Sequence, residues 1–176
     1  MKIVVLNGSP RKNGNTRIMA EAFAEGAKSK NHEVKILDIA HMNIKGCMAC
    51  EYCFAHDGVC VQKDDMALVF DELNTADMVV FAAPIYWFDI TAQLKTVIDR
   101  LYAHGKIGFN FNKTALLLDA GADGGVFTAA ITQYKAMTAF LKWEDKGIIT
   151  IGGMMGKGDM EKAAKLADVR ALGASL

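Results

Sequence analysis

The sequence has no excess of charge of either sign and no apolar run long enough to cross a membrane. Its 176 residues contain 20 Lys plus Arg and 20 Asp plus Glu, so the formal net charge is zero. That balance excludes the basic stripe of a nucleic-acid binder and the polybasic patch of a membrane-surface protein. The longest apolar run, residues 78–88, is interrupted by Pro84 and is too short for a bilayer span. We therefore expect neither a nucleic-acid nor a membrane partner.

The chain also has no cysteine outside residues 46–60 and no signal-peptide pattern. The N-terminal stretch MKIVVLNGSP turns polar after four apolar residues, whereas a signal peptide needs a longer apolar region and a small-residue cleavage site. We therefore expect a cytoplasmic protein. In that reducing compartment, clustered cysteines are more typical of metal or catalytic sites than of disulfides.

Short apolar runs alternate with segments of helical periodicity along the whole chain. This alternation predicts βαβ units, and therefore one α/β domain whose parallel sheet is covered by helices on both faces. Ligands of such sheets bind beyond the carboxyl ends of the strands, near the point where strand order reverses. The expected strands are 3–6, 33–39, 77–83, 114–120 and 147–153, and the expected helices begin near 15, 66, 94, 127 and 159.

The loop after the first strand, GSPRKNGNT (8–16), has the composition of an anion site. It carries hydroxyls on Ser9 and Thr16, a cation at Arg11, and Asn15 at the expected helix N-cap. Backbone amides at a helix N-terminus, with hydroxyls and a cation nearby, are suited to a phosphate group. The glycine spacing matches neither a P-loop nor a dinucleotide loop, so a monophosphate remains. The alternative is a capped turn without a ligand.

Aromatic side chains crowd the segment that follows the third strand, in APIYWFDITAQLKTVIDRLYA (83–103). Large aromatics at the carboxyl end of a strand are costly to leave in water unless they cover a flat apolar group. An isoalloxazine ring is such a group, and Pro84, Ile85 and Tyr86 are the main candidates to contact it. For Trp87 and Phe88, packing in the core or against another subunit is an equal alternative.

The remaining charged and titratable side chains have simpler expected roles. Asp64 and Asp65 precede a helical pattern and are expected to cap it. His104 is isolated in the sequence, so we expect it to be solvated. Three charged residues of the next helix are expected on its outer face, at the surface or in a subunit contact: Lys95, Asp99 and Arg100.

All four cysteines follow the second strand, in the pattern C-x2-C-x2-C-x6-C, at Cys47, Cys50, Cys53 and Cys60. Four thiolates are the ligand set of either a zinc ion or an iron–sulfur cluster. Structural zinc usually takes two separated C-x2-C pairs, so the compact run favours a cluster. A loop without metal and a zinc site remain alternatives. His56 lies within the loop and is expected to be exposed.

Four segments of the chain together resemble a known family. They are the first loop, the P-x-Y-W stretch with its downstream L-K-x-x-I-D-R, the segment GGMMGKGDM (152–160) and the cysteine run. The sequence is similar to flavodoxin-like NAD(P)H-dependent FMN reductases, and most similar to their iron–sulfur flavoprotein branch. The resemblance implies a flavodoxin-like three-layer sandwich with a five-stranded parallel sheet in the order 2-1-3-4-5. It also implies one FMN-binding domain, 1–176, with a cysteine-rich loop, 46–63, inserted after strand two.

The resemblance further implies an FMN-dependent oxidoreductase that passes electrons between a [4Fe–4S] cluster and FMN. The alternatives are an NAD(P)H-dependent FMN or quinone reductase with a vacant cysteine loop, and a flavodoxin-like electron carrier. The expected donor is NAD(P)H or ferredoxin, the expected acceptor is a quinone, a flavin or a similar small molecule, and the expected assembly is a homodimer or homotetramer. No catalytic acid or base is expected, and the cysteine loop should open at the same sheet edge as the flavin loops. The expected FMN-binding residues are Ser9, Arg11, Asn13, Asn15, Thr16, Pro84, Ile85, Tyr86, Trp87, Ala120 and Gly121, and the expected cluster ligands are Cys47, Cys50, Cys53 and Cys60.

Overall fold

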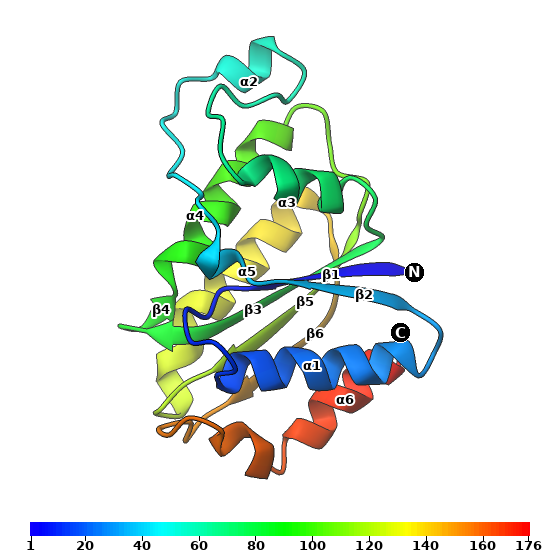
Figure 1. Cartoon of the computed structure of the whole chain (residues 1–176), viewed down its shortest axis with the longest axis vertical. Coiled ribbons are helices and arrows are strands. Elements are labelled where there is room, and N and C mark those ends of the chain that lie inside the picture. Colours follow the sequence, from blue (N-terminus) through cyan, green and yellow to red (C-terminus); the bar gives the residue numbers. More distant parts are fainter.

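A parallel five-stranded sheet forms the centre of the molecule, in a computed structural model that describes residues 1–176 (Figure 1). The strand order is β2-β1-β3-β5-β6, and a sixth, short strand, β4, pairs antiparallel with the end of β3. The strands are β1 (Lys2–Asn7), β2 (Glu33–Leu37), β3 (Met78–Tyr86), β4 (Asp89–Ile90), β5 (Lys113–Asp119) and β6 (Glu144–Ile151). The expected strand order is confirmed, because β5 and β6 are the fourth and fifth strands of the sequence prediction.

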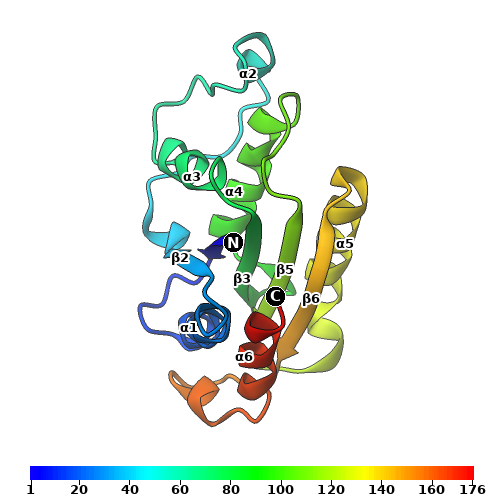
Figure 2. The same ribbon diagram turned by 90° about the vertical axis from the view of Figure 1, so that its right-hand side faces the viewer.

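Helices cover both faces of this sheet, as Figure 2 shows from the side. One face packs against α1 and α6, and the other against α3, α4 and α5, so the molecule has three layers. The helices are α1 (Asn15–Lys28), α2 (Tyr52–Ala55), α3 (Met66–Leu73), α4 (Ala92–Arg100), α5 (Thr128–Leu141) and α6 (Leu166–Ala174). No helix is both long enough and apolar enough to cross a lipid bilayer.

The central strands are apolar along their whole length because both of their faces are covered. In β1, Val4 and Leu6 face the core beneath α3 and α4, while Ile3 and Val5 face α1. All four side chains are fully buried. The edge strand β2 is less buried: its residues are exposed or half-buried, and none is fully buried.

Two features depart from the expected elements. The closing helix is split into a 3₁₀ turn, Asp159–Lys162, and α6, because the turn is tied to the start of α1 rather than continuing the helix. The strand β4 was not expected, since it has only two residues and is joined to β3 by Trp87 and Phe88. Those two residues both have positive φ, as the central positions of a type I′ hairpin turn require, but lack the Asn-Gly signature of such turns.

Candidate functional site

A cleft of about 250 Å³ opens at the carboxyl edge of the sheet, where the loops after β1, β3, β5 and β6 meet. Among the residues predicted to bind flavin, all but Asn13 and Trp87 line this cleft. Three further residues, Asp119, Met154 and Met155, line it and were not predicted. The complete lining is Ser9, Arg11, Asn15, Thr16, Pro84, Ile85, Tyr86, Asp119, Ala120, Gly121, Met154 and Met155.

The start of α1 presents free hydrogen-bond donors to this cleft. The helix begins after Gly14, and it has neither a side-chain cap nor an acidic residue in its first turn. The first amides of a helix have no partner within the helix, and they carry the positive end of its dipole. Arg11 lines the cleft beside them, and neither it nor Lys12 takes part in any of the eight ion pairs of the structure. These groups fit a phosphate.

Asn15 was expected to cap α1, but its side chain instead joins α1 to the loop after β6. Its side-chain nitrogen donates to the carbonyl of Gly156 over 2.8 Å, and its oxygen accepts from the amides of Gly158 and Met160 at 3.0 and 3.2 Å. The side chain is buried, with three backbone partners. Asn15 therefore fixes the position of the segment that carries Met154 and Met155 across the cleft.

Asp119, the last residue of β5, has a buried carboxyl group that lies beneath the loop after β1 (8–16). It accepts a hydrogen bond of 2.5 Å from the hydroxyl of Thr16, so this hydroxyl points its proton into the protein. Burial raises the pKa of Asp119 to about 6, although the Thr16 hydrogen bond and the charge of Arg11 act in the opposite direction. A polar residue at the end of the apolar run LLLD was the available sequence signal.

The segment Ala120–Gly121 brings backbone close to Met155 on one side of the cleft. A Cβ atom on Gly121 would lie 2.7 Å from the sulfur of Met155, so any larger residue would displace this side chain. Met155 itself is exposed, which is unusual for a residue of its kind without a partner. Ala120, Gly121 and Met155 thus leave a shallow apolar wall opposite Tyr86.

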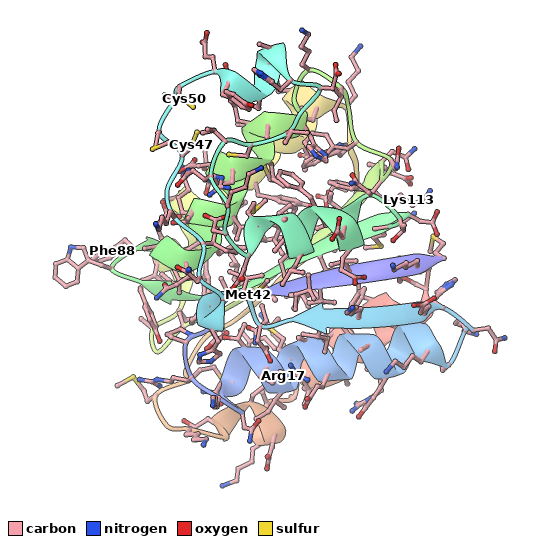
Figure 3. All side chains as sticks on the ribbon, turned by 45° about the horizontal axis from the view of Figure 1, so that its top comes forward. Arg17, Met42, Cys47, Cys50, Phe88 and Lys113 are labelled. Carbon is pink, nitrogen blue, oxygen red and sulfur yellow. The ribbon has the colours of Figure 1, made fainter.

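Trp87 and Phe88 form the tip of the β3–β4 hairpin. Phe88 lies where this hairpin projects from the molecule (Figure 3). The Trp87 side chain is 94% exposed and that of Phe88 is 62% exposed, so neither packs in the core of this chain. Their positive φ angles, 49° and 72°, are strained for bulky residues. Strained backbone with exposed aromatics is characteristic of functional segments rather than of structural turns.

The four cysteines line one small pocket, which is separate from the cleft at the carboxyl edge of the sheet. Cys47 and Cys50 are exposed at its rim, Cys53 is buried and Cys60 is half-buried. The sulfur of Cys47 accepts a hydrogen bond from the amide of Ala49 at 3.5 Å. Ala49 and Glu51 both have positive φ, so the backbone between the cysteines is tightly folded. No three His, Cys, Asp or Glu side chains are arranged here as a closed metal site.

Arg100 closes the inner end of this pocket, and its position contradicts the expectation that it lies on the outer face of α4. It is only 2% exposed, and its two terminal nitrogens form a bidentate ion pair with Asp64 at 2.8 and 3.0 Å. The capping expected of Asp65 is not found, because its side chain accepts from the amide of Asn43 instead. Asp64 accepts from the amides of Lys45 and Met66, the first residue of α3, and holds Arg100 as well. Burial opposes its charged form, but these donors hold the pKa of Asp64 below its usual value. Lys95 and Asp99, by contrast, are exposed and pair with each other.

His104 is buried, although we expected it to be solvated. Its ring stacks on Phe70 with centroids 3.9 Å apart, in the cluster that also holds Phe109. Burial lowers the pKa of His104, so the neutral form is favoured. His56 is exposed, as expected, and stacks on Tyr52.

The cysteine pocket and the cleft lie at opposite ends of α4, and not at one sheet edge as expected. Thr91, at the start of α4, donates to the carbonyl of Gly8 in the first loop over 2.8 Å. Arg100, at its end, lines the cysteine pocket. The nine residues of α4 span about 13 Å, so the cleft and the cysteine pocket are separated by roughly the length of this helix. Residues 38–51 lead away from β2 past α3, so the cysteines lie beyond the helical layer (Figure 1).

Two larger cavities lie elsewhere in the molecule. A groove of about 490 Å³ between α4 and α5 is mostly apolar and includes the exposed Phe140 and Tyr102. A polar cavity of about 370 Å³ lies on the other side of the first loop, where Asp38 pairs with Arg17. Neither cavity contains the aromatic segment or the cysteines.

Comparison with known proteins identifies the family. The model of the family described as NADPH-dependent FMN reductase matches residues 1–152. The chain belongs to the NADPH-dependent FMN reductase family. An iron–sulfur flavoprotein of Methanosarcina thermophila is 32% identical over 156 residues, which cover 86% of this chain and 78% of that protein. One from Archaeoglobus fulgidus is 39% identical over 105 residues, which cover 60% and 47% of the two chains.

The matched region spans about half the length of several of these iron–sulfur flavoproteins. Among solved structures, an NAD(P)H:quinone oxidoreductase from Methanothermobacter marburgensis superposes with a TM-score of 0.74 at 22% identity, covering 99% of this chain and 96% of that one. This likeness shows the flavodoxin-like fold of this FMN reductase family member and confirms the three-layer architecture expected from the sequence.

Proposed function

We propose that this protein is an FMN-dependent oxidoreductase that binds FMN in the cleft between the loops after β1, β3, β5 and β6. The observation that supports this most directly is the uncapped start of α1 beside the unpaired Arg11, in a chain of the FMN reductase family. Bound FMN supplies the redox chemistry, since flavins exchange hydride or single electrons. The protein's part is to hold the phosphate, orient the ring and control access to it.

Each wall of the cleft has a separate task in this proposal. Arg11 and the first amides of α1 bind the phosphate through charge-assisted hydrogen bonds. Tyr86, Ala120, Gly121 and Met155 would line the part of the cleft that holds the flat ring. Asp119 lies beneath the phosphate loop and limits the negative charge that the loop accepts.

We further propose that the four cysteines hold a [4Fe–4S] cluster. The lining of the pocket has the chemistry that such a group requires: all four thiols line it, an amide donates to the sulfur of Cys47, and the buried cation Arg100 lines it as well. Iron–sulfur clusters are held by four thiolates, and hydrogen bonds to the sulfurs set their potentials. The cluster and FMN together would link a one-electron donor such as ferredoxin to a two-electron acceptor.

A second candidate is an NAD(P)H-dependent FMN or quinone reductase whose cysteine loop holds no cluster. It is supported by the match of residues 1–152 to the family described as NADPH-dependent FMN reductase, a description that names no cluster. In both candidates the acceptor is a quinone, a flavin or a similar small molecule. We assign the apolar groove between α4 and α5 to a contact between subunits of a homo-oligomer, since it exposes Phe140 and Tyr102.

Fluorescence titration of the FMN-free protein with FMN tests the assignment of the cleft. Arg11→Ala removes a charge-assisted hydrogen bond, so we expect the Kd to rise by roughly tenfold to a hundredfold. Lys30→Ala is the matched control, because it removes an exposed cation just beyond the opposite end of α1. If Arg11→Ala binds FMN with the same affinity as wild type, the assignment of the phosphate to this loop is wrong. A wild-type protein that takes up no FMN would contradict the proposed function.

A further inference from the structure

Arg100 is the one cation among the residues that line the cysteine pocket. The other ionisable groups there are the four thiols, the carboxylate of Glu51 and the phenol of Tyr102. A buried arginine beside four potential thiolates is not required by the hydrophobic core, and the flavin cleft does not use it. Asp64 balances the charge of Arg100, and what this pair leaves open is the hydrogen bond of the third guanidinium nitrogen.

The hydrogen bonds of Arg100 leave one nitrogen free. Its two terminal nitrogens are committed to Asp64 and to the carbonyl of Lys45. Its third nitrogen, Nε, is buried and has no hydrogen-bond partner, and it is the sole buried side-chain nitrogen or oxygen of the chain in that state. Buried donors without partners are rare, and each indicates a missing acceptor. Cys60 lines the same pocket and lies close enough to act on the guanidinium of Arg100, so its sulfur is the candidate acceptor.

We propose that Arg100 is a positioning residue for the iron–sulfur centre: it compensates the negative charge of the cysteine-bound cluster and donates its Nε–H to a sulfur of the pocket, while Asp64 holds it in place. This inference rests on the proposed cluster. It goes beyond that proposal because it assigns the control of the cluster's reduction potential to a residue that is not a ligand.

The charge of Arg100 should shift the reduction potential of the cluster in a definite direction. Reduction adds one electron, and therefore one negative charge, to the thiolate-bound cluster. A nearby cation stabilises the reduced form, so Arg100 raises the reduction potential, as hydrogen bonds to cluster sulfurs do in general. Asp64 acts in the opposite direction, because its carboxylate offsets part of the Arg100 charge. Removing Arg100 should lower the potential, and removing the charge of Asp64 should raise it.

The test is an anaerobic redox titration of the purified holoprotein, followed by visible and electron paramagnetic resonance spectroscopy. We expect the cluster potential of Arg100→Gln to shift to a more negative value and that of Asp64→Asn to a more positive one. Arg100→Lys keeps the charge but loses the Nε–H group, so its potential should lie between those of Arg100→Gln and wild type. The matched control is Arg170→Gln, which changes an exposed arginine paired with Glu25.

The outcomes separate this inference from the function on which it rests. A wild-type holoprotein with FMN but no iron would overturn both the proposed cluster and the role of Arg100. A wild-type cluster whose potential is the same in Arg100→Gln and Asp64→Asn would overturn the role of Arg100 alone. A merely structural role would shift both variants in the same direction as the loop opens to water. If Arg100→Gln does not fold, the opposite shifts of Asp64→Asn and Arg100→Lys decide the question.

Discussion

Thr16 donates its hydroxyl proton to the buried carboxyl group of Asp119 across 2.5 Å, beneath the loop that opens α1. This bond directs the hydroxyl away from the phosphate that the loop is proposed to bind. It also places a titratable group with a pKa of about 6 next to the cleft. The proposed FMN site therefore contains an acidic group whose charge changes near neutral pH.

FMN affinity should depend on the ionisation of Asp119. Above pH 6 its carboxylate repels the phosphate, whereas below pH 6 it is neutral. A phosphate monoester loses its own second proton near the same pH, so the wild-type profile alone is ambiguous. We therefore expect the ratio of the Kd of wild type to that of Asp119→Asn to rise between pH 5 and 7.5, as measured by fluorescence titration. A ratio that stays constant over this range would show that Asp119 does not sense the phosphate.

Asp119 should also make the stability of the FMN-free protein depend on pH. Its pKa in the folded state, about 6, lies above the reference value of 3.8, so its contribution is present below pH 3.8 and is lost as the pH rises through 6. The loss is about 3 kcal/mol at most. Urea unfolding should show Asp119→Asn gaining stability relative to wild type between pH 4 and 7. A parallel pH dependence of the two proteins would contradict the raised pKa.

Asn15 should be required for the stability of the loop after β6. Asn15→Ala removes one donor and one acceptor and leaves the buried amide of Met160 without its partner. We expect a loss of about 2–3 kcal/mol in the free energy of unfolding, measured in urea. The control is Asn74→Ala, at an exposed position with right-handed helical φ at the end of α3. A change below about 0.5 kcal/mol in Asn15→Ala, within the range of ordinary surface substitutions, would refute this role.

Trp87 should contribute to function and not to folding. Because its side chain is 94% exposed, we expect Trp87→Ala to change the stability by less than about 0.5 kcal/mol. The positive φ at this position favours glycine, so Trp87→Gly should be at least as stable as Trp87→Ala. Thermal unfolding measures both. A loss of several degrees in either variant would mean that the indole packs against something in solution, such as a second subunit.

The sequence was most informative where chemistry and periodicity act locally. The buried strands could be predicted from apolar runs such as 114–120, since a central parallel strand needs apolar residues on both faces. Arg11 and Gly121 could be placed in one cleft because the carboxyl ends of parallel strands meet at one edge.

The positions that could not be predicted depend on partners far along the chain. Helical periodicity assigns Arg100 to a polar face, and only Asp64, 36 residues earlier, makes its burial favourable. His104 is buried by stacking on Phe70, and Asn15 binds a loop more than 140 residues away. The location of the cysteine pocket depends on the path of residues 38–51 past α3, and no local pattern encodes that path.

The most direct test of the account is the composition and visible spectrum of the protein purified without oxygen. We predict one FMN and one four-iron cluster per chain, with flavin bands superimposed on a broad absorption that bleaches when the protein is reduced. Flavin bands without iron would agree with the FMN reductase proposal and contradict the proposed cluster. A colourless protein that also fails to take up added FMN would contradict the central claim.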